Sequence, residues 1–360
     1  MNRRRFLSGL ASAAALASSS RPAPGASPQP DRPRIRLGID NFAVRAMGWK
    51  APDLIRYAAS IRCDTLLISD LDAIGSLDDA ALREVRSQAD AAGIGLYVGS
   101  WSICPTSKAF RKNWGTAEEH VRLGLRVSKA LGSPVFRVVL GTMEDRKTEG
   151  GIRARMADTL AVLRACRRDA LASGVKIALE NHAGDLHSWE LRQLIDDAGH
   201  DFVGANLDTG NAFWTLEDPL DVLETLGPVA LCSSLRDGMV WETQEGAAVQ
   251  WTAAGDGLID WRQLAARWAK LCPQTPIMIE TISGGPRQFP YKQAEFWTHY
   301  DKRPDKLAKF EALAKRGRQI PAFKAPPGPE GKKATQDFQK AELEKSIAYL
   351  RREIGLGLRA

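Results

Sequence analysis

The sequence of 360 residues has few cysteines and no long apolar run, and both features exclude classes of protein. The five cysteines are scattered and form no C-x-x-C pair, so neither a disulfide framework nor a thiolate metal site is indicated. No apolar run approaches the roughly 18 residues that a membrane-spanning helix needs. With 44% hydrophobic and 26% charged residues, the composition is that of an ordinary globular protein with enough apolar side chains for a large core.

Acidic residues are absent from the first 30 positions, and the formal net charge of +7 is unevenly distributed. Residues 1–30 contain four arginines, and residues 302–360 contain 15 lysines and arginines against seven acidic residues, a net of +8. Residues 31–301 therefore carry −5. A mildly acidic body argues against a groove for nucleic-acid phosphates, so we expect no nucleic-acid partner.

The N-terminal segment has the pattern of a targeting signal. The letters RRRFL at residues 3–7 precede a weakly apolar run over residues 10–16 and the small-residue site Ala-Leu-Ala at residues 15–17. Residues 1–17 resemble a twin-arginine signal peptide, which implies a periplasmic or otherwise exported protein. Residues 18–34, rich in Pro, Ser and Ala, predict a disordered linker.

From residue 35 onward one unit repeats: a short apolar run, a loop, an amphipathic helix and a glycine stop. Eight strand–helix units in about 250 residues predict an α/β fold, a (β/α)8 TIM barrel over residues 35–300. An open doubly wound sheet is the competing prediction, and it would require a glycine-rich turn after the first strand. Residues 40–42, Asp-Asn-Phe, form no such turn, which argues against that fold. The predicted strands cover residues 35–40, 65–69, 94–99, 135–140, 177–180, 203–208, 229–235 and 276–280.

Local signals mark the ends of several predicted helices. Thr116 and Glu119 form a capping box, and Asp218 precedes a proline at its favoured first helical position. Beyond the barrel, a helix over about residues 302–316 and a charged helix over roughly residues 335–354 predict a basic C-terminal helical extension. This extension, residues 301–360, is expected to pack on the barrel or on a partner, and a homodimer is one such arrangement.

Three predicted strands of the second half end in a carboxylate, namely Glu180, Asp208 and Glu280. The active sites of TIM barrels lie at the C-terminal ends of the strands, and an unpaired buried carboxylate is costly. Three converging carboxylates therefore predict a bound cation, although each acid alone could simply bond a neighbouring loop amide. Oxygen ligands suit Mn²⁺ or Mg²⁺, and Zn²⁺ is an alternative if His182, on the same strand face as Glu180, joins them.

The segments that surround these acids are LENH (179–182), DTGN (208–211), LRD (235–237), GDGLID (255–260) and IE (279–280). In their order and spacing they resemble the xylose-isomerase-like TIM-barrel family, the sugar phosphate isomerase/epimerase superfamily. The resemblance implies that acids and a histidine from strands five to eight hold one divalent metal. It also implies that Glu180 and Glu280 act on opposite faces of a bound sugar.

The sequence departs from this family at one expected ligand. Ser234 stands where the family usually has a histidine, and serine is a poor ligand for divalent metals. We therefore expect His182, a water molecule or the substrate to complete the metal site. The endonuclease branch of the family is rejected, because it needs several more histidines than the five present and a basic face for DNA.

Seven of the ten tryptophans fall in segments that we expect to be loops after strands or in the terminal loop: Trp49, Trp101, Trp114, Trp214, Trp241, Trp251 and Trp297. Flat aromatic rings beside polar groups favour stacking on sugars, although these rings could equally plug the barrel or pack the tail. Trp101, Asn211, Arg236 and Ser234 are the expected substrate contacts. Arg236 is alternatively expected to pair with Asp237 or Glu242, and Arg137 to pack internally with a charged partner.

These features predict an exported, metal-dependent isomerase or epimerase that acts on a sugar or keto-sugar. Glu180 and Glu280 would exchange protons with carbons next to a carbonyl, while the metal would bind substrate oxygens. With a leaving group on the next carbon the same chemistry gives elimination, so a lyase is the nearest alternative. A non-catalytic sugar-binding protein on a degenerate barrel is the second alternative, and Ser234 is its best support.

Overall fold

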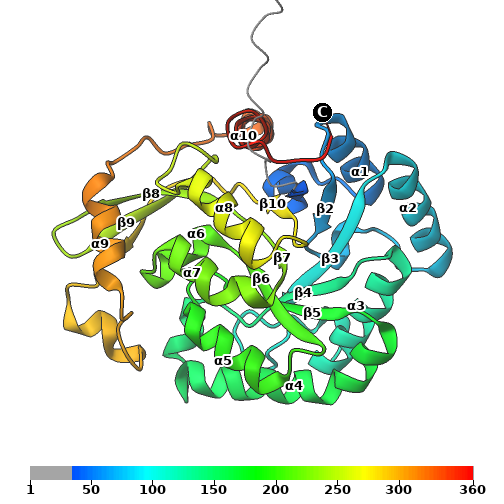
Figure 1. The fold of residues 1–360 in the computed structure, drawn as a ribbon, viewed down its shortest axis with the longest axis horizontal. Helices are drawn as coiled ribbons and strands as arrows, with labels where there is room; N and C mark the ends of the chain where they lie inside the picture. Colours follow the sequence, from blue (N-terminus) through cyan, green and yellow to red (C-terminus); the bar gives the residue numbers. More distant parts are fainter. Residues whose placement is uncertain (1–34, 360) are drawn as a thin grey trace, which may run out of the picture. The chain divides into compact units, whose positions relative to one another are not determined.

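Eight parallel strands form a nearly closed barrel within residues 35–359, the part of the chain that the computed structural model describes (Figure 1). The barrel strands are β1 (Leu37–Asp40), β2 (Thr65–Ile68), β3 (Gly95–Ser102), β4 (Val135–Val139), β5 (Lys176–Glu180), β6 (Val203–Leu207), β7 (Ala230–Ser233) and β10 (Ile277–Ile279). From β1 to β7 each strand pairs with the next, and β10 pairs with β1. A single bridge between Leu235 and Ile279 joins the β7 side to β10. The predicted TIM barrel is confirmed.

Helices alternate with the barrel strands, as the repeated glycine stops predict. They are α1 (Ala51–Ser60), α2 (Asp79–Ala92), α3 (Ala117–Leu131), α4 (Gly151–Ser173), α5 (Ser188–Ala198), α6 (Thr209–Ala212), α7 (Pro219–Leu226) and α8 (Trp261–Leu271). The capping box is present, since the Glu119 amide donates to Thr116 Oγ1 at 3.2 Å and the Thr116 amide donates to Glu119 Oε2 at 2.8 Å. Asp218 accepts from the Leu220 amide at 2.8 Å and caps α7.

The segments predicted as a signal peptide and a linker, residues 1–17 and 18–34, lie outside the described residues. Among the described residues, no helix combines the length and the apolar character that crossing a bilayer requires.

A three-stranded antiparallel sheet lies outside the barrel, in segments that the sequence presents as loops. It consists of β8 (Asp237–Glu242), β9 (Ala247–Thr252) and β11 (Arg287–Phe289), in the order β11-β9-β8. None of these three strands is among the eight that the sequence predicts. Hydrogen bonds between β9 and β11 form only in the folded chain, because β11 follows the last barrel strand. This sheet brings additional side chains to the C-terminal ends of the barrel strands.

The C-terminal part of the chain forms α9 (Leu307–Arg316) and α10 (Pro329–Tyr349), followed by a short π-helical turn, η8 (Leu350–Ile354). In Figure 1, α10 (red) lies beside β10 and close to α1. The Ala46 amide donates to Gln339 Oε1 at 2.9 Å, and Leu343 is completely buried. Helix α10 thus packs on the barrel in the place of its eighth helix, the first of the two arrangements expected for the C-terminal extension.

Substitution of Leu343 by alanine tests this packing. Because Leu343 is fully buried, we expect the free energy of unfolding to fall by about 2–4 kcal/mol, measured by urea denaturation. The matched control is Lys340→Ala, an exposed position on the same helix, which should change the free energy by about 0.5 kcal/mol or less. Equal small effects of the two substitutions would contradict an integral α10.

Candidate active site

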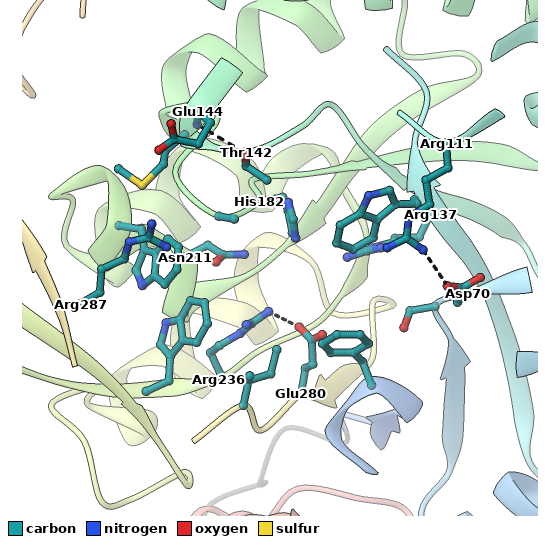
Figure 2. A pocket seen from close by; sticks show the side chains of 18 residues that line it. Asp70, Arg111, Arg137, Thr142, Glu144, His182, Asn211, Arg236, Glu280 and Arg287 are labelled. Carbon is teal, nitrogen blue, oxygen red and sulfur yellow. Dashed lines mark hydrogen bonds and ion pairs between the residues drawn. The ribbon is translucent and has the colours of Figure 1, made fainter. Parts of the chain in front are cut away.

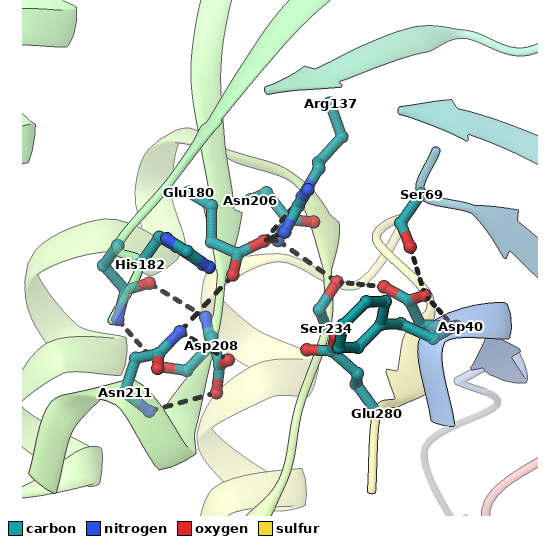
Figure 3. Close-up of polar contacts among 12 residues, drawn as sticks. Asp40, Ser69, Arg137, Glu180, His182, Asn206, Asp208, Asn211, Ser234 and Glu280 are labelled. Carbon is teal, nitrogen blue, oxygen red and sulfur yellow. Dashed lines mark hydrogen bonds and ion pairs between the residues drawn. The ribbon is translucent and has the colours of Figure 1, made fainter. Parts of the chain in front are cut away.

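The three strand-end carboxylates converge at the mouth of the barrel (Figure 3). Glu180 ends β5, Asp208 directly follows β6, and Glu280 directly follows β10. All three are buried, and one carboxylate oxygen of each lies within 4.8 Å of the others. Parallel strands place their C-terminal ends at one edge, which is why residues 100 positions apart in the sequence meet here.

Hydrogen bonds between the loops hold Asp208 in place. The Asp208 amide donates to Asn181 Oδ1 at 2.9 Å, and Asn181 Nδ2 donates back to the Asp208 carbonyl at 2.7 Å. Asp208 Oδ1 accepts from the Gly210 amide at 2.7 Å and so caps α6. The Asn181 side chain and the turn after β6 therefore fix the position of this carboxylate.

Two buried arginines pair with the three carboxylates. Arg236 lies 2.5 Å from Asp208 and also forms an ion pair with Glu280 (Figure 2). Arg137 donates to Glu180 Oε2 at 2.6 Å, as expected of an internally packed arginine with a charged partner. The alternative partners expected for Arg236 were wrong. Asp237, one of them, instead accepts from Trp261 Nε1 at 2.8 Å.

A fourth carboxylate, Asp40 at the end of β1, belongs to the same network and was missed at the sequence level. Ser69 Oγ donates to Asp40 Oδ1 at 2.6 Å, and Ser234 Oγ donates to Asp40 Oδ2 at 3.0 Å (Figure 3). The sequence did contain a signal for Asp40, because this residue ends an apolar strand just as Glu180 does. Ser234 is fully buried and also accepts from Asn206 Nδ2 at 3.3 Å, so its position does not favour the predicted substrate contact.

Negative charge exceeds positive charge in this buried network. If all four carboxylates were ionised, Arg137 and Arg236 would balance only half of their charge. Burial raises the pKa of Asp208 to about 7 against the opposing effect of Arg236, and burial also raises the pKa of Glu180 and, well above its ordinary value, that of Glu280. Protons or a divalent cation can supply the missing positive charge.

The buried acidic triad could hold a metal ion. Three carboxylate oxygens within 4.8 Å of one another form a donor set that hard divalent cations prefer. Asn211 adds a buried Oδ1 that has no hydrogen-bond donor among the described residues. Because Arg236 bridges Asp208 and Glu280, its guanidinium would have to move for both acids to bind a cation.

His182 lies beside the triad but is not a member of that close group of potential ligands among the described residues. Its Nδ1 lies 2.7 Å from the Gly141 carbonyl oxygen, which can only accept, so Nδ1 carries the proton and Nε2 is an acceptor. Burial lowers the pKa of His182 to about 3, so the ring is neutral at physiological pH. A neutral ring whose Nε2 has no hydrogen-bond partner within residues 35–359 suits either a metal ligand or a substrate contact, and the role of His182 as a metal ligand stays a prediction.

A cavity of about 480 Å³ opens above the network. Of the residues singled out in the sequence, Glu280, His182, Asn211, Arg236 and Trp101 line it. Glu180, Asp208 and Ser234 are not part of the lining and are buried below it. Glu280 is thus the carboxylate of the triad that faces the cavity directly (Figure 2).

Three of the seven singled-out tryptophans line the cavity, namely Trp101, Trp214 and Trp251. Two of them do not lie in loops as expected, since Trp101 is in β3 and Trp251 is in β9. Trp214 and Trp251 stack with ring centroids 4.4 Å apart and planes 5° apart. Trp101 contacts His182 edge-on at 5.2 Å. The cavity therefore has aromatic walls and a polar floor, and whether these rings stack on a sugar stays a prediction.

Several cavity-lining residues were not singled out as substrate contacts from the sequence, among them Phe42, Arg111, Arg137 and Arg287. Arg111 stacks over Trp101 at 4.8 Å, and Arg287 stacks over Trp214 at 4.5 Å. No local pattern marks these arginines, because their neighbours in space come from other strands and loops.

Comparison with known proteins supports this architecture. Residues 55–298 match the family model described as "Xylose isomerase-like TIM barrel". A search of curated protein sequences finds no match. Among solved structures, a D-psicose 3-epimerase crystallised in the presence of D-fructose is similar, with a TM-score of 0.57 and 14% identity over 89% of this chain and 100% of that one.

Two further solved structures are similar at comparable levels. The IOLI protein with a bound zinc atom has a TM-score of 0.55 and 14% identity, over 87% of this chain and 99% of that one. A 3-keto-D-glucoside 4-epimerase from E. coli has a TM-score of 0.53 and 13% identity, over 78% of this chain and 100% of that one. At such identities these structures show a shared fold. Because the family model spans most of the barrel, the chain belongs to the xylose isomerase-like TIM barrel family.

Proposed function

We propose that the protein is a metal-dependent isomerase or epimerase that acts on a sugar or keto-sugar. The observation that carries this proposal is the group of three buried carboxylates at the floor of an aromatic-walled cavity. Sugar epimerases among the similar solved structures add support. The metal would be held by Glu180, Asp208 and Glu280, and Mn²⁺ or Mg²⁺ suits these oxygen ligands, with Zn²⁺ as the alternative if His182 takes part.

The two glutamates are suited to proton exchange with a bound substrate. Burial raises the pKa of both, so each carboxyl group holds a proton more readily than an exposed glutamate does. Glu280 faces the cavity, while Glu180 lies below and contacts Asn211 Nδ2 at 3.3 Å. When bound, the metal would polarise the substrate carbonyl and so acidify the adjacent C–H bonds.

Unpaired polar atoms at the floor of the cavity are suited to hydroxyl groups. Arg236 Nε is a buried donor and Asn211 Oδ1 a buried acceptor, and neither has a partner among the described residues. Leaving such atoms unpaired is costly, and a sugar hydroxyl can both donate and accept. These two residues are therefore proposed to orient the substrate, with Trp101 supplying an apolar face.

We also propose export by the twin-arginine route and a periplasmic or otherwise exported location. This part of the proposal is supported by the sequence of residues 1–17 alone.

Deuterium exchange tests the proposed chemistry. The protein is incubated with aldoses, ketoses and 3-keto-glycosides plus Mn²⁺ in D₂O, and we expect deuterium to enter a substrate carbon next to a carbonyl. Glu180→Gln and Glu280→Gln should each slow the exchange at least about 100-fold, because each removes a proton-transferring group. Glu242→Gln, an exposed strand-end glutamate away from the cavity, is the matched control and should exchange like the native protein.

Exchange that survives both active-site substitutions would refute the roles of the two glutamates. Release of a leaving group from the glycosides, in place of isomerised product, would identify the lyase alternative.

Metal titration tests the cofactor separately from activity. We expect metal-free protein to bind one Mn²⁺, seen as loss of the free-ion signal in electron paramagnetic resonance, and Asp208→Asn to weaken binding at least about tenfold. Because burial raises the pKa of Asp208 to about 7, protons compete with the ion, and affinity should increase from about pH 6 to about pH 8. Asp256→Asn, an exposed site, is the control. Equal affinity of native protein and Asp208→Asn, or no uptake of Mn²⁺, Mg²⁺ or Zn²⁺, would count against this site.

A further inference from the structure

Arg287 differs from every other charged side chain that lines the cavity. Among residues 35–359, the lining acids and the other lining arginines all have an oppositely charged partner: Asp70 with Arg111 at 3.9 Å, Glu144 with Lys147 at 3.0 Å, Glu280 with Arg236, and Arg137 with Glu180 at 2.5 Å. Arg287, on β11, forms no ion pair and no side-chain hydrogen bond within this part of the chain. Arg287, an exposed residue at the rim, is therefore the charged lining side chain without an oppositely charged partner among the described residues.

Stacked aromatic rings hold this arginine at the rim. The Arg287 guanidinium carbon lies 4.5 Å from the ring centroid of Trp214, and Trp214 stacks on Trp251. On the opposite side of Trp251, the guanidinium carbon of Arg236 lies 4.4 Å from the ring centroid. These contacts form a column of two arginines and two tryptophans that line the cavity, and Figure 2 labels its two ends, Arg236 and Arg287.

The column leaves the donor groups of Arg287 available. Stacking engages the flat face of a guanidinium, whereas its N–H bonds point outward in the plane of the group. One terminal nitrogen of Arg236 contacts both Asp208 and Glu280, whereas Arg287 has no acceptor among the described residues. A guanidinium that already lies against an aromatic ring loses less conformational freedom when it binds a ligand than a free one does. Its planar fork matches the two oxygens of a carboxylate.

We propose that the substrate is a sugar acid, whose carboxylate binds Arg287 while its reacting carbons lie over Glu280. This inference rests on the proposed function and adds a substrate class to it. A single unpaired guanidinium matches a carboxylate of charge −1, whereas a phosphate dianion would keep an uncompensated charge. Arg287 is accordingly a residue for substrate specificity, and it takes no part in the proton transfer.

Calorimetric binding tests the proposal without relying on turnover. D-Glucuronate and D-galacturonate are titrated into the protein beside their neutral parents, D-glucose and D-galactose, with D-glucose 6-phosphate as a third kind of ligand. We expect each sugar acid to bind at least about tenfold more tightly than its neutral parent, because a hydrogen-bonded charge pair is stronger than a neutral contact. The preference should shrink at high salt.

Two substitutions assign the preference to Arg287. Arg287→Gln should remove the preference for sugar acids, while the affinity for neutral sugars stays within about twofold of the native value. Arg287→Lys should retain part of the preference. The matched control is Arg303→Gln, because Arg303 also stacks on a tryptophan, Trp297, at 5.1 Å but does not line the cavity. This control should keep the full preference.

Four results would each overturn the proposal. Sugar acids and neutral sugars could bind with equal affinity, or the preference for sugar acids could survive Arg287→Gln. The sugar phosphate could bind more tightly than the sugar acids, or none of these ligands could bind. Deuterium exchange remains an independent measurement. A protein that selects sugar acids through Arg287 but exchanges no proton would refute the proposed reaction and leave the recognition of the carboxylate standing.

Discussion

An excess of buried negative charge at the C-terminal end of the barrel governs the rest of the site. Four carboxylates meet there, and two arginines would balance only half of their charge if all four were ionised. Burying unbalanced charge is strongly unfavourable, so the network must take up protons or a cation. Uptake of a proton and uptake of a cation are both useful to an enzyme that moves protons, because the same acids can then bind a metal and exchange a proton.

The barrel stabilises this concentration of charge, because rigid strand ends and hydrogen-bonded loops surround it. The strand ends fix the carboxylates, and hydrogen bonds such as those between Asn181 and Asp208 align neighbouring loops. The antiparallel sheet outside the barrel then adds the aromatic wall, with Trp251 and Arg287 on paired strands β9 and β11. The barrel thus supplies the polar floor and Trp101, and the segments after its strands supply Trp214, Trp251 and Arg287.

The barrel and its acidic floor could be predicted from the sequence because both depend on local patterns. Each strand is a short apolar run, and Glu180, Asp208 and Glu280 each end one. The partners of Arg236 could not be predicted, since they depend on which loops meet in space. The sheet that carries Arg287 was missed because β11 has only three residues, too few for a recognisable pattern, and its pairing with β9 is set by tertiary structure.

The most direct test of the central claim is anomalous diffraction from crystals of the protein grown with Mn²⁺. The account predicts a manganese peak within bonding distance of Glu180, Asp208 and Glu280, with the Arg236 guanidinium moved away from at least one of its two acids. Crystals that show no such peak, with Arg236 still bridging Asp208 and Glu280, would contradict it.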